Sequence, residues 1–335
     1  MTALPAILLG FVPVVLFLVG LIFMDSYKLV APRAVALALA AGCVSALAAL
    51  LVTRVAIGAL HADPAPYTRV AAPLLEETLK ALYVIHLVRA HKAGFMVDAG
   101  ILGFAVGTGF ALTENLYYVQ ALADFRPLLW VARGLGTAVM HGAATAMVAI
   151  LYKDLADRHE SRAVHLLVPG LALAIALHAG FNHLTLQPLV VTAILLLVMP
   201  LLLVLVFERS ERATRTWLGS GIDGDVEVLE QLLGDQFTDS HSGRYLETLR
   251  ARFSGPVVAD MLCLLRIHLE LSLGAKGILL ARSAGIRIPV DSQVRENFAE
   301  LRYLERSIGA TGKLALLPIL RNSSRELWQH HMLER

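Results

Sequence analysis

Seven apolar runs, each about as long as a membrane-crossing helix, occupy most of the first 207 residues and restrict the fold more than any other feature. They are Leu4–Met24, Ala34–Thr53, Ala71–Val88, Ala99–Val119, Leu128–Leu151, Ala163–Leu184 and Leu189–Phe207. A helix needs ~20 mostly apolar residues to cross the ~30 Å hydrocarbon core of a bilayer. We therefore predict an all-α fold in which residues 1–207 form a polytopic membrane helix bundle of about seven spans.

The chain changes character after the seventh run. Residues 208–335 carry 17 of the 27 acidic residues together with 17 basic ones. Their apolar residues recur at helical spacing, as in Phe298, Leu301, Leu304 and Ile308. The most apolar stretch, 257–273, is interrupted by Arg266, His268 and Glu270, which argues against a further span. We predict a C-terminal soluble helical domain over 208–335, and we find no catalytic pattern in it.

Basic residues in the short loops predict the orientation of the spans, because cytoplasmic loops carry the excess of lysine and arginine. One set of alternate loops holds Lys28, Arg33, Arg89, Lys92, Lys153, Arg158, Arg162, Arg209, Arg212 and Arg215. The other set holds only Arg54, Arg69, Arg126 and, at the start of the fifth run, Arg133. This difference places the C-terminus in the cytoplasm and the N-terminus outside.

Three carboxylates lie within the apolar runs, where a purely structural span would have none. They are Glu76 and Glu77 in the third run and Glu114 in the fourth, and Lys80 accompanies the first two. An ionisable side chain near the bilayer centre costs at least ~2.5–3.5 kcal/mol on insertion scales, so such residues are candidates for function. The alternative is a structural ion pair between Glu76 and Lys80, which are one helical turn apart. That pair would not explain the second glutamate.

Two histidines lie at a depth that matches the glutamates. In the predicted orientation the three glutamates lie about five residues, or ~7–8 Å at 1.5 Å per residue, from the outer boundary. His178 in the sixth run lies about six residues from the same boundary, and His141 lies near the middle of the fifth run. Small residues follow both histidines and leave space for a water or a substrate backbone. We therefore expect four spans to contribute to one site.

The order of these residues resembles the PrsW family of intramembrane proteases, a branch of the superfamily that contains the CAAX prenyl-proteases and the bacteriocin-immunity proteases. The matching motifs are Glu76-Glu77-x-x-Lys80, Phe110-x-x-x-Glu114-Asn115, His141 and His178-x-x-x-Asn182. The resemblance covers about Ala71 to Leu184. CAAX prenyl-proteases usually have histidine at the position of Glu114, so the resemblance favours the PrsW branch.

The resemblance implies a peptidase that cleaves a membrane protein within or beside the bilayer, in bacteria often an anti-sigma factor. It implies catalytic roles for Glu76, Glu77, His178 and His141, and a supporting role for Asn182. It also implies a location in a bacterial cytoplasmic membrane and a single-pass membrane protein as substrate.

Amide hydrolysis requires an activated water, a group that stabilises the oxyanion and a proton for the leaving amine. No serine or cysteine lies at the shared depth as a nucleophile. We therefore expect Glu77 or Glu76 to act as general base on a water held by His178, and we group Glu114 with these catalytic residues. His141, Asn115 and Asn182 are the expected donors to the oxyanion. Lys80 is expected to make the two neighbouring glutamates differ, so that one can act as base and the other as acid. This mechanism requires no cofactor.

A zinc-dependent mechanism uses nearly the same residues. Glu77, His141 and His178 could hold zinc at a three-ligand catalytic site with an open position. The sequence lacks a His-Glu-x-x-His motif on one helix, so we favour the metal-free glutamate mechanism.

Two alternatives belong to other functional classes. A proton-coupled transporter could use the glutamates and histidines as a relay, but no internal repeat is present and the polar groups cluster near one face. An inactive scaffold of protease ancestry could bind partner helices. The intact set of motifs argues against this alternative, because a scaffold would not need them. The net charge of only +2 indicates no nucleic-acid partner, and the bilayer is the expected environment.

Overall fold

A computed structural model of the chain describes residues 3–58, 61, 63–121, 127–183, 188–234, 237, 240–286, 288–289, 291–320, 328–329 and 332–333. Every regular element in these ranges is a helix, which confirms the predicted all-α class. Contacts between residues divide the chain into two compact units, Met1–Glu211 and Arg212–Arg335. The predicted loop residue Arg126 and the predicted span end Leu184 lie outside the described residues.

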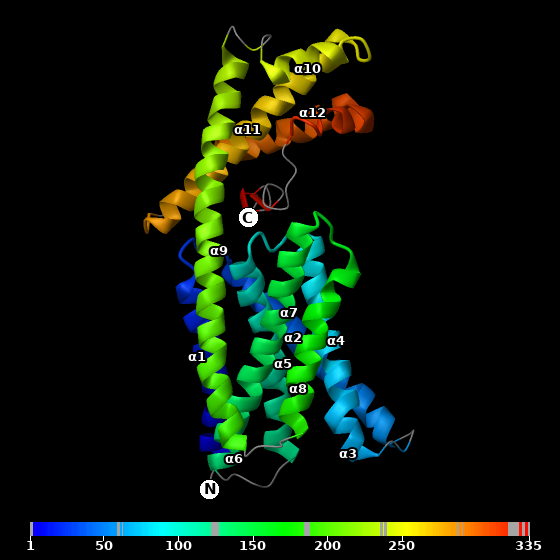
Figure 1. The fold of residues 1–335 in the computed structure, drawn as a ribbon, viewed down its shortest axis with the longest axis vertical. Helices are drawn as coiled ribbons and strands as arrows, with labels where there is room; N and C mark the ends of the chain where they lie inside the picture. The colour runs from blue at the N-terminus through cyan, green and yellow to red at the C-terminus, as the bar shows by residue number, and fades with distance from the viewer. Residues whose placement is uncertain are drawn as a thin grey trace. The chain divides into compact units, whose positions relative to one another are not determined.

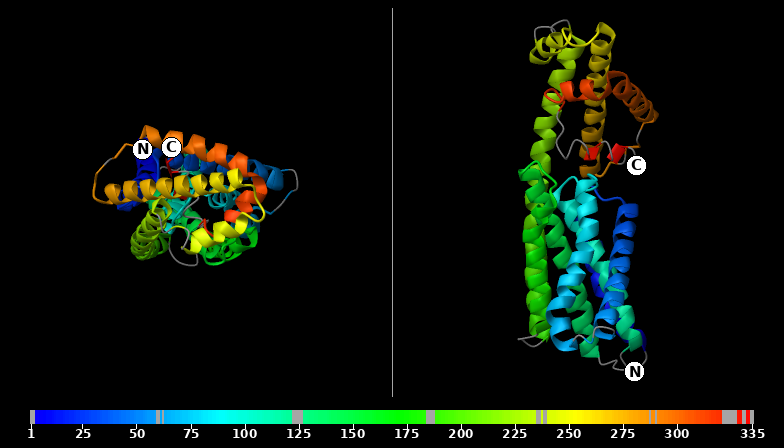
Figure 2. Two further views of the ribbon diagram at one scale, coloured as in Figure 1. Left: turned by 90° about the horizontal axis from the view of Figure 1, so that it is seen from above. Right: turned by 90° about the vertical axis from the view of Figure 1, so that its right-hand side faces the viewer.

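The first unit is a bundle of long helices that lie side by side (Figure 1; Figure 2, right). The long helices are α1 (Ala3–Met24), α2 (Pro32–Gly58), α4 (Ala72–Arg89), α5 (Met96–Ala121), α7 (Ala138–Arg158), α8 (Val168–His183) and α9 (Pro188–Leu233). Short elements complete it: α3 (Pro64–Pro66), α6 (Pro127–Val131), the π-helices η1 (Tyr67–Ala71) and η2 (Ala132–Thr137), and the 3-10 helix η3 (Val164–Leu167). The seven long helices correspond to the seven apolar runs.

Six helical segments in the described residues are long and apolar enough to cross a membrane, and they account for every predicted span except the third. The third is α4, which has 18 residues and carries Glu76, Glu77, Lys80 and Arg89. Its polarity reflects burial within the bundle, because the side chains of Glu77 and Lys80 are fully buried. A helical membrane bundle is therefore the architecture of this unit.

Helix α5 forms the centre of the bundle and packs against α1, α2, α4 and α7. Its glycines allow backbones to approach closely, as expected for small residues in membrane helices. A Cβ added to Gly103 would lie 2.8 Å from the Cβ of Ala149, and a Cβ added to Gly107 would overlap the backbone carbonyl of His141. The glycines of α5 therefore fix the position of the helix that carries His141.

We expect Gly107→Ala to destabilise the bundle, because its new methyl group would push α7 away from α5. Overpacking of this kind typically costs about 1–3 kcal/mol. Thermal unfolding of the purified protein in detergent measures the effect. Gly180→Ala is the matched control, since a Cβ at Gly180 meets nothing within 4 Å in the described structure. Equal unfolding temperatures for the two variants would contradict the close approach of α5 and α7.

The second unit contains the C-terminal part of α9 with α10 (His241–Leu249), α11 (Gly255–Ser283) and α12 (Ser292–Leu316). The predicted apolar stripe of α12 is buried at Phe298, Leu301, Leu304 and Ile308. Helix α11 contains the stretch 257–273 and is not among the membrane-crossing candidates. Inside this unit, Lys276 of α11 forms a buried ion pair with Asp225 of α9.

Candidate active site

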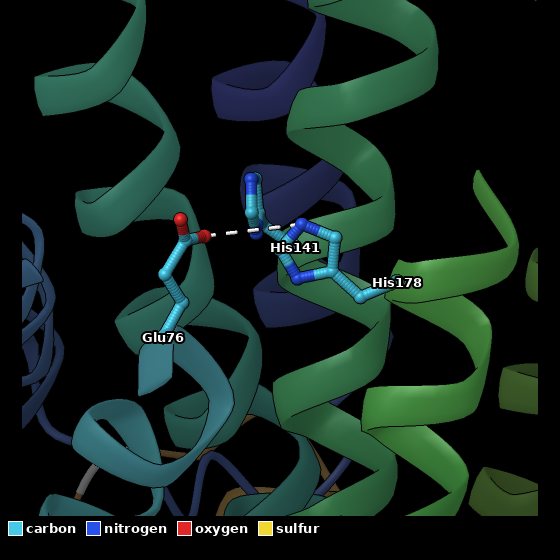
Figure 3. A group of neighbouring side chains, drawn as sticks. All are labelled: Glu76, His141 and His178. Atoms are coloured by element: carbon cyan, nitrogen blue, oxygen red, sulfur yellow. Dashed lines mark ion pairs between the residues drawn. The ribbon is translucent and has the colours of Figure 1, made fainter. Parts of the chain in front are cut away.

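Four helices of the first unit bring the predicted site residues together. Helix α4 contributes Glu76 and Glu77, α5 contributes Glu114, α7 contributes His141 and α8 contributes His178. Figure 3 shows that the carboxylate of Glu76 reaches across from α4 toward the imidazoles of His141 and His178. The two imidazole rings are perpendicular, with centroids 4.7 Å apart. The common depth inferred from the sequence therefore corresponds to direct proximity.

Glu77 and Lys80 form a fully buried ion pair at the base of the site. The Lys80 Nζ lies 2.6 Å from the Glu77 Oε1, and neither side chain is exposed. The sequence suggested an ion pair between Glu76 and Lys80. In the structure Lys80 pairs with the next glutamate, Glu77. The reason is the rotation of α4, which buries Glu77 and Lys80 and leaves Glu76 partly exposed, with 17% of its side chain accessible.

His178 is held in a defined orientation by Glu77. Its Nδ1 lies 2.8 Å from the Glu77 Oε1. A carboxylate can only accept, so the Nδ1–H donates and the lone pair of the imidazole is on Nε2. This Nε2 lies 3.8 Å from the Glu76 Oε2, the pair joined by the dashed line in Figure 3. A base nitrogen and a carboxylate oxygen therefore face each other across a short gap.

His141 is held from both sides. Its Nδ1 lies 3.1 Å from the Lys80 Nζ, and its Nε2 lies 3.2 Å from the Glu114 Oε2. An ammonium group has donors and no acceptor, so Lys80 donates to Nδ1 and the imidazole proton is on Nε2, which donates to Glu114. Both nitrogens of His141 are thereby occupied within the protein.

Glu114 also pairs with Arg133, a residue that the sequence indicated only as a loop cation. The Arg133 Nη2 lies 3.4 Å from the Glu114 Oε2, and its Nε–H donates to the Asn115 Oδ1 at 3.0 Å. The Asn115 Nδ2 in turn donates to the backbone carbonyl of Gly10 in α1 at 2.8 Å. Arg133 lies in η2, and π-helical turns occur often at functional sites. Its position near the start of the fifth apolar run, between Ala132 and Gly134, was the only sequence signal for it.

A cavity of about 610 Å³ opens beside these groups. Four predicted site residues line it: Glu76, Glu114, His178 and Asn182. Arg133 and Tyr118 also face it. The other four predicted residues, Glu77, Lys80, His141 and Asn115, do not line the cavity and lie in its supporting wall. The predicted residues thus fall into two sets. One set lines the cavity and can contact a substrate, and the other set lies behind it and holds the first in position.

One wall of the cavity is a single face of α2. It consists of Ala46, Ala49, Leu50, Thr53, Arg54 and Ile57. These positions follow helical spacing and carry no carboxylate or imidazole. Opposite them, Asn182 of α8 donates from its Nδ2 to the backbone carbonyl of Thr68 in η1 at 3.1 Å.

Two carboxylate oxygens at the site have no hydrogen-bond partner within the described part of the chain. They are the Oε2 atoms of Glu76 and Glu77, and both are buried. Buried polar atoms are nearly always paired, so such atoms indicate a missing partner such as a water, an ion or a substrate group. For Glu76 the partner would lie between its Oε2 and the Nε2 of His178.

Glu76, His141 and His178 form the one group of potential metal ligands found among the described residues. They offer one atom each, and these atoms all lie within 4.8 Å of one another. This group contains Glu76 in place of the Glu77 considered from the sequence, because Glu77 is engaged with Lys80 and the Nδ1 of His178. A glutamate with two histidines matches the donor set of catalytic zinc sites.

The hydrogen bonds of these three residues fit a metal ion only in part. His178 fits, because its Nδ1–H is bonded to a buried carboxylate and its Nε2 is free, as in typical metal-ligating histidines. Glu76 fits, because its Oε2 has no partner in the described structure. His141 does not fit, because the Lys80 ammonium uses its lone pair and its Nε2–H is bonded to Glu114. Ligation by His141 would require loss of both the proton and the hydrogen bond.

Comparison with protein families gives one match in keeping with this site. The model of a family described as PrsW family intramembrane metalloprotease matches residues 31–206, more than half of the chain. No curated protein and no solved structure matches the chain. The matched range contains all eight predicted site residues and the whole wall formed by α2.

Proposed function

The chain belongs to the PrsW family of intramembrane proteases, and from this premise we propose that it hydrolyses a peptide bond of a membrane protein by means of a water activated by Glu76. The observation that carries the proposal is the pair formed by the Glu76 Oε2 and the His178 Nε2, 3.8 Å apart at the wall of the cavity. Both atoms are acceptors, and a water placed between them would donate one hydrogen to each.

In the proposed reaction Glu76 is the general base. The oxygen of the held water attacks the carbonyl carbon of the scissile bond while its proton passes to the Glu76 carboxylate. When the tetrahedral intermediate collapses, the C–N bond breaks and the proton moves from Glu76 to the leaving amine. Proton transfer of this kind typically contributes 10²–10⁴-fold to the rate, so roughly that much depends on one carboxylate.

Glu77 and Lys80 have a positioning role in this proposal. Glu77 accepts the Nδ1–H of His178 and thereby keeps the lone pair of Nε2 directed at the water. The charge of Glu77 is balanced by Lys80, whose ammonium also directs the Nε2–H of His141 toward Glu114. An imidazole held in one tautomer by a carboxylate is a recurrent arrangement in hydrolytic sites.

A zinc-dependent form of the same protease is the second candidate. The family description and the proximity of Glu76, His141 and His178 favour it. The chemistry that zinc supplies in such sites is activation of a bound water. The occupied nitrogens of His141 weigh against it, and for this reason we place the metal-free reaction first.

Metal analysis separates the two forms. We expect protein purified without added metal to contain substoichiometric zinc and to keep its activity after treatment with EDTA, because two of the three groups cannot hold the ion tightly without the third. Elemental analysis and cleavage assays before and after chelation measure this. Stoichiometric zinc, together with activity that EDTA removes and zinc restores, would replace the first form by the second.

The proposed substrate is a single-pass membrane protein, and an anti-sigma factor is one such protein. The predicted orientation, with the N-terminus outside and the C-terminus in the cytoplasm of a bacterial cell, would place the cut near the outer surface of the cytoplasmic membrane. The alanine, leucine and isoleucine side chains in the wall formed by α2 support a substrate segment of apolar character.

Comparative proteomics of membranes tests the proposed function. Cells that produce the wild-type chain are compared with cells that produce Glu76→Gln at equal amounts. We expect a fragment of a single-pass membrane protein only with the wild type, and its new terminus identifies the cut bond. Identical membrane proteomes, or capture of a partner without any cleavage, would contradict the peptidase and favour a binding protein.

A further inference from the structure

The reaction proposed above needs donors for the oxyanion, and each residue predicted for that role already uses at least one N–H within the protein. The His141 Nε2–H is bonded to Glu114, and one Nδ2–H of Asn115 and one of Asn182 are bonded to the carbonyls of Gly10 and Thr68. Preorganised donors directed at the developing oxyanion usually provide the largest single contribution to such a reaction. A group with several donors at the cavity wall would supply more of this stabilisation than the one remaining N–H of Asn182.

Arg133 has unused donors at the wall of the cavity. Its guanidinium has five N–H groups, of which the Nε–H is bonded to Asn115. Its Nη2 is buried and has no hydrogen bond to any described residue, although Glu114 lies 3.4 Å away as an ion pair. The side chain as a whole is 14% exposed and lines the cavity, and a partly buried guanidinium of this kind is suited to a carbonyl oxygen or an anion.

The guanidinium is held rigidly in this position. Its carbon lies 3.7 Å from the centre of the Tyr118 ring, so the planar group is stacked on α5. Asn115, which holds the Nε side, is itself buried and anchored to α1. The next residue, Gly134, has no space for a side chain, because a Cβ there would overlap the carbonyl of Leu9 in α1. A donor fixed by its surroundings costs little reorganisation when charge develops in front of it.

Arg133 lines the same cavity as the proposed base Glu76. Glu114 joins the Arg133 Nη2 to the His141 Nε2 through contacts of 3.4 Å and 3.2 Å, and the His141 ring is in contact with that of His178. Arg133, Glu76 and His178 all line one cavity. A peptide bond in this cavity could thus meet both the held water and the guanidinium.

We propose that Arg133 is a catalytic residue that donates hydrogen bonds to the carbonyl oxygen of the scissile bond and stabilises the oxyanion. This inference rests on the proposed function. As the water oxygen bonds to the carbonyl carbon, the π electrons of the C=O bond move to oxygen, and the Arg133 N–H groups receive that negative charge. The electrons return to re-form the C=O bond as the amine leaves. Glu114 balances the charge of Arg133 before substrate arrives.

A binding experiment tests this proposal without turnover. The probes are an apolar peptide amide and the matching phosphinate pseudopeptide, whose anionic tetrahedral group resembles the intermediate. Affinities of both are measured for wild type, Arg133→Gln and Arg133→Lys in detergent. Arg69→Gln is the control, since Arg69 is a neighbouring exposed arginine in η1 that does not line the cavity.

We expect the wild type and Arg69→Gln to bind the phosphinate more tightly than the amide. Arg133→Gln should lose about 10²–10³-fold in phosphinate affinity, the usual effect of removing one oxyanion donor, while its amide affinity stays nearly constant. Arg133→Lys keeps the positive charge beside Glu114, so it should remain folded and lose an intermediate amount. Unchanged phosphinate preference in either Arg133 variant, or no preference in the wild type, would overturn the proposal. If the proposed peptidase function itself is wrong, the membrane proteomes of cells with the wild type and with Glu76→Gln would instead be identical.

Discussion

Glu76→Gln is expected to lower cleavage by about 10²–10⁴-fold and to leave the stability of the protein unchanged. Glutamine has the same shape as glutamate but cannot take a proton from the water. The folded state should tolerate it, because the Glu76 carboxylate faces the neutral imidazole of His178 at 3.8 Å and is not held by a cation among the described residues of the site. Cleavage of the single-pass substrate identified by proteomics and thermal unfolding in detergent measure the two quantities.

Thr78→Ala is the matched control for this variant. Thr78 lies on the exposed side of α4 and its hydroxyl is bonded within the helix to the carbonyl of Leu74, so its loss should change neither quantity. Cleavage by Glu76→Gln within tenfold of the wild type would show that another group is the base. A large loss of stability in Glu76→Gln would show that the carboxylate is structural.

Lys80→Met is expected to destabilise the bundle by about 3–5 kcal/mol, the usual effect of removing one partner of a buried ion pair. Methionine keeps the length of the side chain, so packing against the Phe110 ring should remain. The Glu77 carboxylate, however, would be left buried without a cation. His141 would also lose the donor to its Nδ1. Unfolding followed by tryptophan fluorescence reports the change, because Trp130 is fully buried in the same unit.

The double variant Glu77→Gln/Lys80→Met distinguishes the lost charge balance from a lost contact. Removing both charges leaves no uncompensated ion, and replacing a buried pair by neutral residues is often close to neutral for stability. We therefore expect the double variant to be more stable than Lys80→Met alone. If the two unfold at the same temperature, the charge of Glu77 is not what Lys80 balances.

The sequence predicts the composition of the site better than its internal arrangement. Polar residues in apolar runs stand out because burying them in a membrane is costly, and this singled out Glu76, Glu77, Lys80, Glu114 and His178. Their depth followed from counting residues along straight helices. The family match over residues 31–206 confirms the family that these motifs resemble.

The partners of these residues depend on how the helices rotate and approach one another, which the periodicity of one helix does not determine. Both Glu76 and Glu77 are within reach of Lys80 on a helix, and only the packing of α4 selects Glu77. Asn115 was expected at the oxyanion, yet its amide is bonded to Gly10, which is 105 residues away in the sequence. The π-helical turn that carries Arg133 has no signature in the apolar pattern.

The face of α2 that forms one wall of the cavity has a consequence for how such a protein can evolve. The acid–base groups come from α4, α5, α7 and α8, whereas α2 presents mostly small and aliphatic side chains to whatever occupies the cavity. In the proposed reaction, selectivity and reactivity would thus be encoded on different helices. We expect substitutions along α2 to change which polypeptide binds without altering the hydrolytic residues.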